Sequence, residues 1–480
     1  MELTLLLRAS DARGLSRSPV VQKARTGATR GQAARIVWHD GPGHALAEKG
    51  RVLAEMAGVW RLEQYQPAPA ETWPPGTDHR LIDEVRAPDL PRQFPPDGLI
   101  EVGRFEGRRT VFSLTVGGAA ISMTVLNGML RAGMAETPAT RLTLSGPAAA
   151  VRSLALTLAG TVPLSVPAHS LAAEARWLAD GTPPAPRRSG APVLSDALPS
   201  AQTAFAHVLG HLTDVVLFLA PRVTDAAAGV EAVHQTRVAV RRARLAMALF
   251  RPVIGTPDLG PDLGHAAEGL KQLSQMLGPA RDWDVFMTET LPAVVTALPD
   301  QTSLTALERS GAHRREAARA ALAAYLDSPE FRLVCLQLTC LAWAEPSGDA
   351  TPLTAFASTV LQARWKKLLK TGKSLENLDD SGLHALRLKA KRTRYAAEFF
   401  APLFPAKPAA RFIRRLSALQ ENLGVFNDTS VAGTLVRALN ARPGFACGLV
   451  LGFTAARGAG IRPKIVRSWE KLRQRDPFWE

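Results

Sequence analysis

Cysteine is scarce in this sequence, with only Cys335, Cys340 and Cys447 among 480 residues. An odd number of cysteines, without a nearby histidine or cysteine at metal-ligand spacing, argues against a disulfide framework or a zinc site. The sequence therefore predicts three buried, reduced cysteines, as is typical of cytoplasmic proteins. It predicts neither a metal ion nor a cofactor.

Long hydrophobic runs are also missing from the sequence. No segment approaches the roughly 18 uncharged apolar residues that a membrane-spanning helix requires. The opening MELTLLLR has no basic region ahead of its short apolar run, unlike a secretory signal. We expect a cytoplasmic protein that does not associate with membranes.

Acidic residues are few in the last quarter of the chain. From Leu361 to Glu480 there are 23 lysines and arginines against 9 aspartates and glutamates, whereas the first 360 residues hold 35 against 34. The formal charge of +15 therefore lies almost entirely in this last quarter. Such a concentration of positive charge favours a polyanionic partner.

The length and the residue patterns indicate more than one domain. Residues 1–180 contain short alternating runs such as ELTLLL and RRTVFSLTV, which predict strands. Residues 181–200 are rich in proline, glycine and serine and predict a linker. Residues 201–480 have a helical hydrophobic period. We predict an α+β protein, in which an antiparallel β domain is followed by an all-α domain.

The helical part repeats internally. HQTRVAVRRAR from His234 matches HALRLKAKRTR from His384, and LKQLSQMLGPARDWDV from Leu270 matches LSALQENLGVFNDTSV from Leu416. Two long matches in the same order indicate a duplicated unit. We place the two copies at about 201–345 and 350–480.

Each copy carries a histidine and three cations on one helical face, within about 80° of one another. The first stripe is His234, Arg237, Arg241 and Arg244, and the second is His384, Arg387, Lys391 and Arg394. Arg242 and Arg392 stand off these stripes, and Lys389 is on another face. Like charges at this spacing repel, and neither stripe contains an acid four residues away to relieve the repulsion. Arginine offers forked donors that match phosphate oxygens, so the stripes favour an external anion.

Each of these interpretations has a simpler competitor. A charge run is usually a solvated helix face, and a lone histidine is often a core or capping residue; the repetition of the whole pattern favours binding. Asp282 and Asp284 resemble metal or acid–base carboxylates, but a helix N-cap and an ion pair with an arginine explain them better. Asp428 occupies the position that matches Asp282. Trp365 and Tyr395 are predicted to be packing residues.

The helical part resembles the CHAD family, the conserved histidine α-helical domain, over about residues 201–480. The motifs that carry the resemblance are VHQTRVAVRRARLAMALF, LGPARDWDVF, LHALRLKAKRTRYAAEFF, LGVFNDTSVA and the terminal DPFWE. It implies two pseudo-symmetric four-helix bundles that meet at a basic channel for inorganic polyphosphate. The implied channel residues are His234, Arg237, Arg241, Arg242, Arg244, His384, Arg387, Lys391, Arg392 and Arg394. Further cations, which are otherwise solvated surface residues, are Lys271, Arg364, Lys367, Lys370, Arg411, Arg414 and Arg415.

Residues 1–180 contain the motifs ELTLLL, VWHDG, GRFEGRRTVFSL, SMTVLNG and HSLAAEARWL. With these motifs they resemble a CYTH domain, a triphosphate tunnel built as an antiparallel β-barrel. The family's opening Glu-x-Glu-x-Lys strand is here Glu2-Leu3-Thr4-Leu5-Leu6, which keeps one carboxylate and loses the lysine. Where the family places acids on later strands, this chain has Ser122 and Leu126. Hydrolysis in such a tunnel needs a divalent metal held by several oxygens. The departures therefore predict a catalytically inactive domain, and Arg104, Arg108 and Arg109 are expected at the surface or at a strand edge rather than on an anion.

The leading hypothesis is non-enzymatic binding of inorganic polyphosphate, with recruitment to polyphosphate granules in the cytoplasm. A second hypothesis is nucleic-acid binding, which the sequence pI of about 10.3 permits. Aromatic residues, which single-strand binders use as stacking platforms, make up only 6% of the chain and are absent between the cations of the stripes. A third hypothesis is an active metal-dependent triphosphatase, and a fourth is a purely structural helical repeat.

Overall fold

The computed structural model consists of two compact units. The described residues are 1–66, 73–86, 98–182, 192–195, 198–225, 228–254, 260–299, 303–343, 351–439, 444–474 and 476–480, without the side chains at 85–86, 260–261 and 427–430. Unit 1 contains Met1–Arg188, Leu209–Phe218 and Ser328–Pro346. Unit 2 contains Ser189–Val208, Leu219–Asp327 and Ser347–Glu480. The predicted domain boundaries at residues 180 and 200 stay predictions.

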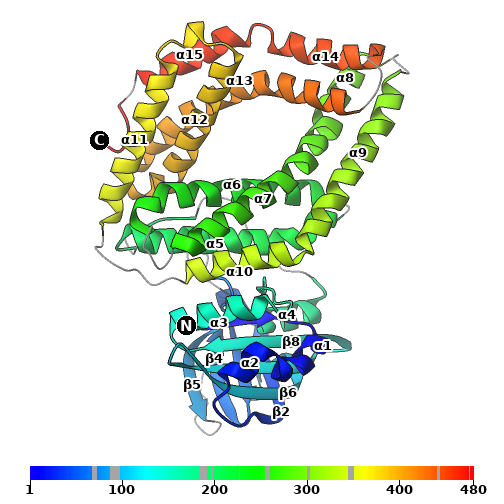
Figure 1. Cartoon of the computed structure of the whole chain (residues 1–480), viewed down its shortest axis with the longest axis vertical. Helices are drawn as coiled ribbons and strands as arrows, with labels where there is room; N and C mark the ends of the chain where they lie inside the picture. The colour runs from blue at the N-terminus through cyan, green and yellow to red at the C-terminus, as the bar shows by residue number, and fades with distance from the viewer. Residues whose placement is uncertain are drawn as a thin grey trace. The chain divides into compact units, whose positions relative to one another are not determined.

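An eight-stranded antiparallel sheet forms the centre of unit 1 (Figure 1). Its order is β1-β8-β7-β6-β2-β3-β4-β5. The strands are β1 (Glu2–Leu6), β2 (Arg30–Asp40), β3 (Arg51–Met56), β4 (Val59–Gln64), β5 (Arg80–Arg86), β6 (Ile100–Val116), β7 (Ala119–Ala132) and β8 (Ala135–Ser145). The predicted antiparallel β domain is confirmed, and within the described residues its sheet is a curled half-barrel with β1 and β5 at its ends.

The long β6–β7 hairpin shows how local sequence fixes the sheet. Its two-residue turn is Gly117-Gly118, with φ angles of +56° and +80°. Glycine tolerates positive φ without a steric penalty, and such turns match the twist of the two strands. Buried residues alternate along each half of both strands, and the buried face changes between the halves. In β6 it passes from Phe105 to Phe112 and Leu114, and in β7 from Met123 to Leu130.

Four short helices accompany the sheet: α1 (Ala9–Gly14), α2 (Pro19–Ala24), α3 (Ala148–Ala159) and α4 (Leu171–Asp180). The Ser170 side chain caps α4 by accepting a hydrogen bond from the backbone N–H of Ala173 at 3.2 Å. Leu171 and Ala175 of this helix pack in one cluster with Trp38, Phe105 and Leu130 of the sheet. Next to this cluster, the opposite face of β6 carries the partly exposed polar side chains of Arg104 and Glu106.

The rest of the chain is helical, which confirms the predicted all-α region (Figure 1). The first repeat holds α5 (Ala201–Leu219), α6 (Gly229–Ile254), α7 (Gly260–Val285), α8 (Leu291–Ala297), α9 (Ser303–Leu326) and α10 (Pro329–Ala342). The second holds α11 (Leu353–Gly372), α12 (Asp380–Phe400), α13 (Ala406–Ala438), α14 (Phe445–Gly458) and α15 (Ile461–Arg473). In matching fashion, α6 packs against α7 and α12 packs against α13, and α6 also contacts α12.

One helix corrects the hydropathy analysis. The segment Ala201–Thr224 has 24 residues, and its most apolar 18-residue window has a mean hydropathy of 1.5, so it is long and apolar enough to cross a membrane by length and composition alone. The sequence pattern predicts no membrane-spanning run of uncharged apolar residues; this helix is an exception by length and composition, although it contains Asp214. Because 78% of its most apolar window is buried, the hydrophobicity of this helix is accounted for by core packing.

Aromatic side chains join the two repeats within unit 2. Phe250 of α6 lies 5.1 Å from Phe356 of α11 and 5.8 Å from Phe400 of α12, measured between ring centroids. The terminal DPFWE motif packs by the same means, because Phe478 and Trp479 both contact the Phe412 ring. The predicted burial of Trp365, Tyr395 and the three cysteines is confirmed. These contacts hold α6 and α12, which carry the stripes, in one core.

Candidate anion-binding site

The two cationic stripes lie on continuous helices. His234, Arg237, Arg241 and Arg244 lie on α6, and His384, Arg387, Lys391 and Arg394 lie on α12. The Asp379 side chain caps the N-terminus of α12 by accepting a hydrogen bond from the backbone N–H of Gly382 at 2.8 Å. Small buried residues, such as Ala239 on α6 and Ala390 on α12, line other faces of the two helices. The two helices contact each other, the inner stripe residues are half-buried, and Arg244 and His384 remain exposed.

Five of the stripe cations interact as one group, which we call the central cluster: Arg237, Arg241, Arg387, Lys391 and Arg394. Burial, together with the positive charges of Arg241, Arg387, Arg237 and Arg394, lowers the pKa of Lys391 to about 7. Burial and the same neighbouring guanidinium groups also lower the pKa of Arg241. These mutual effects place cations of both repeats in one electrostatic site.

Two members of the central cluster have no carboxylate partner among the described residues. Neither Arg241 nor Lys391 lies within 4.0 Å of an acidic oxygen there, although Arg237, Arg242 and Arg394 do. The Nε atom of Arg241 is buried and has no hydrogen-bond acceptor within this part of the structure. A half-buried cation without a counter-ion is costly, so this site is suited to an anion from outside the chain.

Glu398 corrects the expectation that the stripes lack acidic neighbours. Its carboxylate accepts a hydrogen bond from Arg242 Nη2 at 2.7 Å and lies 3.3 Å from Arg394 Nη1. Glu398 is four residues beyond Arg394, just outside the stripe, so the repulsion at that end is relieved within the chain. The off-stripe position of Arg242 is explained by the same contact, because its side chain crosses from α6 to α12.

The two histidines differ in their surroundings. His234 is half-buried, and burial together with the positive charge of Arg281 lowers its pKa from the ordinary value of 6.5. It is therefore mostly neutral at pH 7 in the free protein. His384 is exposed in the first turns of α12. Only an anion bound close by would favour the cationic form of His234 at neutral pH.

The remaining predicted cations lie outside the central cluster. Arg364 and Arg392 form a separate pair, because burial and the charge of Arg392 lower the pKa of Arg364. Arg244 and Lys271 line a pocket of about 1040 Å³ between α6 and α7, where Lys271 Nζ lies 3.0 Å from Glu268 Oε1. Exposed positions on α11 and α13 hold Lys367, Lys370, Arg411 and Arg414, and Arg415 donates to the Lys471 carbonyl oxygen at 3.0 Å. The cations that the sequence predicts for one channel therefore lie at several separate positions on the helices.

Asp282 and Asp284 lie near the C-terminal end of α7, so the predicted helix N-cap is wrong for both. The predicted ion pairs with arginine are present. Asp284 is fully buried and accepts hydrogen bonds from Arg315 Nε at 2.7 Å and Arg319 Nε at 3.0 Å, while Asp282 lies 3.8 Å from Arg237. The Asp428 side chain lies outside the described residues. Within the described part of the chain, no group of three or more acidic, histidine or cysteine side chains is placed to hold a metal ion.

Unit 1 contains a polar network that the sequence analysis missed. His79 lies between two carboxylates, with Nε2 3.5 Å from Glu63 and Nδ1 3.4 Å from Asp78. Burial opposes the protonation of His79, but the hydrogen bond to Asp78 and the charges of both acids raise its pKa to about 9. Nearby, the buried Arg141 lies 2.5 Å from Glu174. These residues form no recognisable sequence motif. The network therefore becomes visible only in the structure, where distant segments bring the side chains together.

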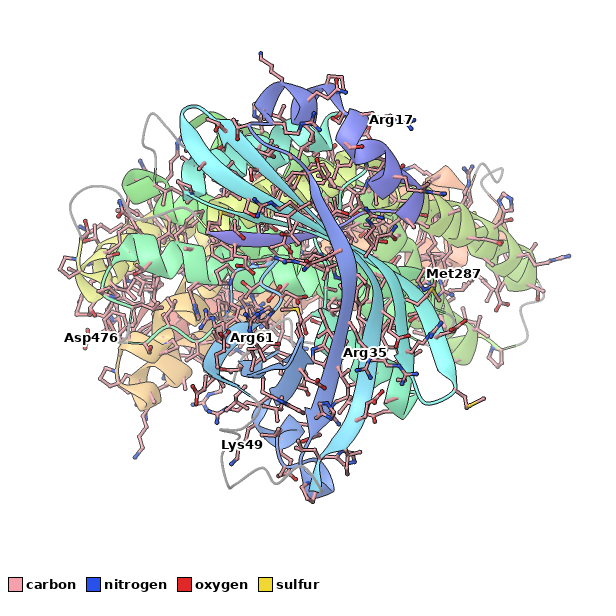
Figure 2. All side chains as sticks on the ribbon, turned by 90° about the horizontal axis from the view of Figure 1, so that it is seen from below. Arg17, Arg35, Lys49, Arg61, Met287 and Asp476 are labelled. Atoms are coloured by element: carbon pink, nitrogen blue, oxygen red, sulfur yellow. The ribbon has the colours of Figure 1, made fainter. Side chains whose placement is uncertain are left out.

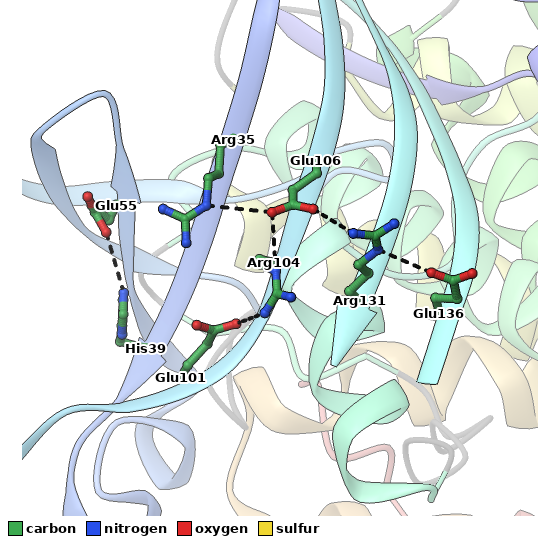
Figure 3. Close-up of polar contacts among 8 residues, drawn as sticks. All are labelled: Arg35, His39, Glu55, Glu101, Arg104, Glu106, Arg131 and Glu136. Atoms are coloured by element: carbon green, nitrogen blue, oxygen red, sulfur yellow. Dashed lines mark hydrogen bonds and ion pairs between the residues drawn. The ribbon is translucent and has the colours of Figure 1, made fainter. Parts of the chain in front are cut away.

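The face of β6 and β7 opposite Phe105 and Leu130 carries a second set of ion pairs (Figure 3). Glu106 lies 3.7 Å from Arg35, 3.3 Å from Arg104 and 2.8 Å from Arg131. Arg104 also lies 2.7 Å from Glu101. Figure 2 labels Arg35 and Arg61, which extend from β2 and β4, and Arg61 likewise pairs with Glu84 at 2.7 Å. Arg104 thus has acidic partners within the sheet, as expected of a surface residue.

Comparisons with known proteins agree with this description of the helical region. A family model described as the CHAD domain matches residues 200–437. The crystal structure of the CHAD domain from the plant Ricinus communis is 31% identical, with a TM-score of 0.52, and covers 60% of this chain and 97% of its own. PptA from Streptomyces chartreusis is 17% identical, with a TM-score of 0.46 over 57% of this chain and 99% of its own.

A third structure covers a smaller part of the chain. It is the putative adenylyl cyclase HpAC1 from Hippeastrum, described as having a dominant triphosphatase activity. It is 12% identical, with a TM-score of 0.24 over 34% of this chain and 88% of its own. A score this low does not establish a common fold, so the CYTH resemblance of residues 1–180 stays a prediction. No curated protein matches the chain. The agreement of the family model with the Ricinus structure shows that this chain belongs to the CHAD domain family.

Proposed function

We propose that this protein binds inorganic polyphosphate through the central cluster and does so without catalysis. The observation that carries the proposal is the presence of Arg241 and Lys391 in a shared, half-buried site without acidic partners among the described residues. Crowded cations raise the free energy of the unbound site, and a bound chain of phosphates would relieve that repulsion.

The form of the site supports polyphosphate over a nucleic acid. Polyphosphate offers dense charge but no rings or base edges, so its recognition requires cations and little else. The Tyr395 ring, whose centroid lies 5.9 Å from the guanidinium carbon of Arg241, is only 5% exposed. It cannot serve as an open stacking platform for a base. Nucleic-acid binding remains the second candidate, and the exposed cations of α11 and α13 are what favours it.

A direct titration tests the proposal. The full chain is titrated with polyphosphates of graded length, with duplex DNA and ATP as controls, at several salt concentrations. We expect tight binding to long chains, with an affinity that falls steeply with salt through counter-ion release. Polyphosphate should displace DNA at a far lower phosphate concentration. Equal or stronger binding of DNA would support nucleic-acid binding and contradict the proposal.

We propose that unit 1 is not an active triphosphatase. The acids Glu63, Asp78 and Glu174 contact His79 and Arg141, so they already neutralise cations of this unit. A metal-dependent tunnel instead needs acids that are open to the metal and cations that are open to the phosphates. In the cell, we expect the chain to associate with cytoplasmic polyphosphate granules, which co-localisation of a labelled chain would test.

A further inference from the structure

Glu398 connects cations of both repeats. Its carboxylate contacts Arg242 of α6 at 2.7 Å and Arg394 of α12 at 3.3 Å. The three side chains are 12–22% exposed, so the group is largely shielded from solvent but can still be reached by it. Arg242 and Arg394 are two of the ten channel residues that the family resemblance implies. Both therefore already contact an acidic side chain of the protein itself.

Tyr395 links this ion-paired group to the open part of the site. Its buried ring lies 5.1 Å from the guanidinium carbon of Arg394, 5.4 Å from that of Arg242 and 5.9 Å from that of Arg241. A phosphate chain that reached Arg241 would therefore lie close to the two arginines that Glu398 holds. Guanidinium groups bind carboxylates and phosphates through the same forked donors, so the two acceptors compete.

We propose that Glu398 is a built-in competitor of the bound anion, which withholds Arg242 and Arg394 from the ligand and so sets the affinity of the site. This inference rests on the proposed function. In the free protein Glu398 supplies the counter-charge that these shielded arginines need. An anion gains them only by displacing Glu398, so a ligand of low charge density binds through the other cations alone. Glu398 thus stabilises the fold and limits binding.

The variant Glu398→Gln separates these two effects. It keeps the shape of the side chain but removes its charge, and with it the carboxylate that contacts both Arg242 and Arg394. We expect a lower melting temperature in the absence of ligand, about tenfold tighter polyphosphate binding, and a salt dependence steeper by about 0.7 for each arginine that becomes a phosphate contact. Glu421→Gln, at an exposed position of α13, removes the same charge and controls for the overall electrostatic effect.

The outcomes are distinguishable. Tighter and more salt-sensitive binding by Glu398→Gln, but not by Glu421→Gln, supports the inference. An unchanged or weaker affinity with an unchanged salt slope overturns it and leaves polyphosphate binding by the original chain intact. If the original chain binds no polyphosphate, the proposed function itself is refuted. Should Glu398→Gln not fold, Glu398→Asp keeps the charge with a shorter reach. A smaller gain in affinity by that variant is expected, and no gain overturns the inference.

Discussion

The His79 network of unit 1 and the central cluster of unit 2 differ in how their shielded charges are neutralised. In unit 1, His79 contacts Glu63 and Asp78, and Arg141 contacts Glu174, so the polar groups neutralise one another. In unit 2, Arg241 and Lys391 share a site with other cations and contact no acid among the described residues. The number of cations therefore does not by itself make an anion site. What matters is whether the fold has already supplied their counter-ions.

Removal of cations of the central cluster should have the largest effect. We expect the combined variant Arg237→Ala, Arg241→Ala, Arg387→Ala and Lys391→Ala to weaken polyphosphate binding by more than about 100-fold, because each lost phosphate contact also removes counter-ion release. A titration at fixed salt measures this change, and circular dichroism checks that the helices persist.

A matched control tests whether the position of the charge matters. Four exposed cations outside the site give the same loss of charge when they are changed to alanine: Arg309, Arg314, Lys366 and Lys407. We expect this control to bind nearly as well as the original chain. If both variants lose affinity equally, binding follows overall charge, and the contrast between the two units has no functional meaning.

The second-largest expected effect is a dependence of the polyphosphate affinity on pH, which arises from Lys391. Its pKa is about 7 in the free protein, because burial and four neighbouring arginines disfavour the charged form, and bound phosphate would raise it. Binding therefore takes up a proton above pH 7, and the affinity should fall by up to about tenfold per pH unit between pH 7 and 9. In the free protein the pKa of His234 is lowered from 6.5, so before the anion binds this group is neutral throughout the range.

Lys391→Arg isolates this effect, since arginine keeps its charge throughout the range. The variant should bind polyphosphate with an affinity that is nearly flat from pH 7 to 9. Calorimetry in two buffers of different ionisation enthalpy should detect proton uptake at pH 8 by the original chain and not by the variant. The same pH slope in both proteins would contradict the role of Lys391.

The network in unit 1 should give a smaller effect, on stability alone. The pKa of His79 is raised from 6.5 to about 9 in the folded state. Its contribution is therefore fully present below pH 6.5 and is lost as the pH rises through 9. Because the His79 side chain is 31% exposed, we expect about 1 to 2 kcal/mol. Thermal unfolding at pH 6 and pH 9 should show this loss, and His79→Gln should reduce it without changing polyphosphate affinity.

The smallest expected signal is the release of phosphate by a triphosphatase activity. With magnesium or manganese, the purified chain should release no phosphate from tripolyphosphate or ATP above the level of a heat-denatured sample. Phosphate release that depends on metal and disappears in Glu2→Gln would contradict the proposal. It would also show that the acids of unit 1 are not held by their partners during turnover.

The Glu398 contact shows where sequence reasoning failed. Glu398 stands four residues after Arg394, and that local ion pair is visible in the sequence once the stripe is extended by one turn. Its partner on α6, Arg242, is 156 residues away, and no spacing rule connects the two. Likewise, the sequence predicts Asp284 at a helix start, but α7 continues to Val285 and its partner Arg319 comes from α9.

The sequence by itself determined the features that depend on local periodicity. These are the strands of unit 1, the helices that follow, the duplication, and the common helical face of each cationic stripe, because backbone geometry fixes which nearby residues share a face. Only the tertiary structure decided which charges are neutralised. Ion pairs form between segments that are remote in the chain, and packing sets how far burial shifts a group such as Lys391. The cations that are open to a ligand are those for which folding provides no acidic partner.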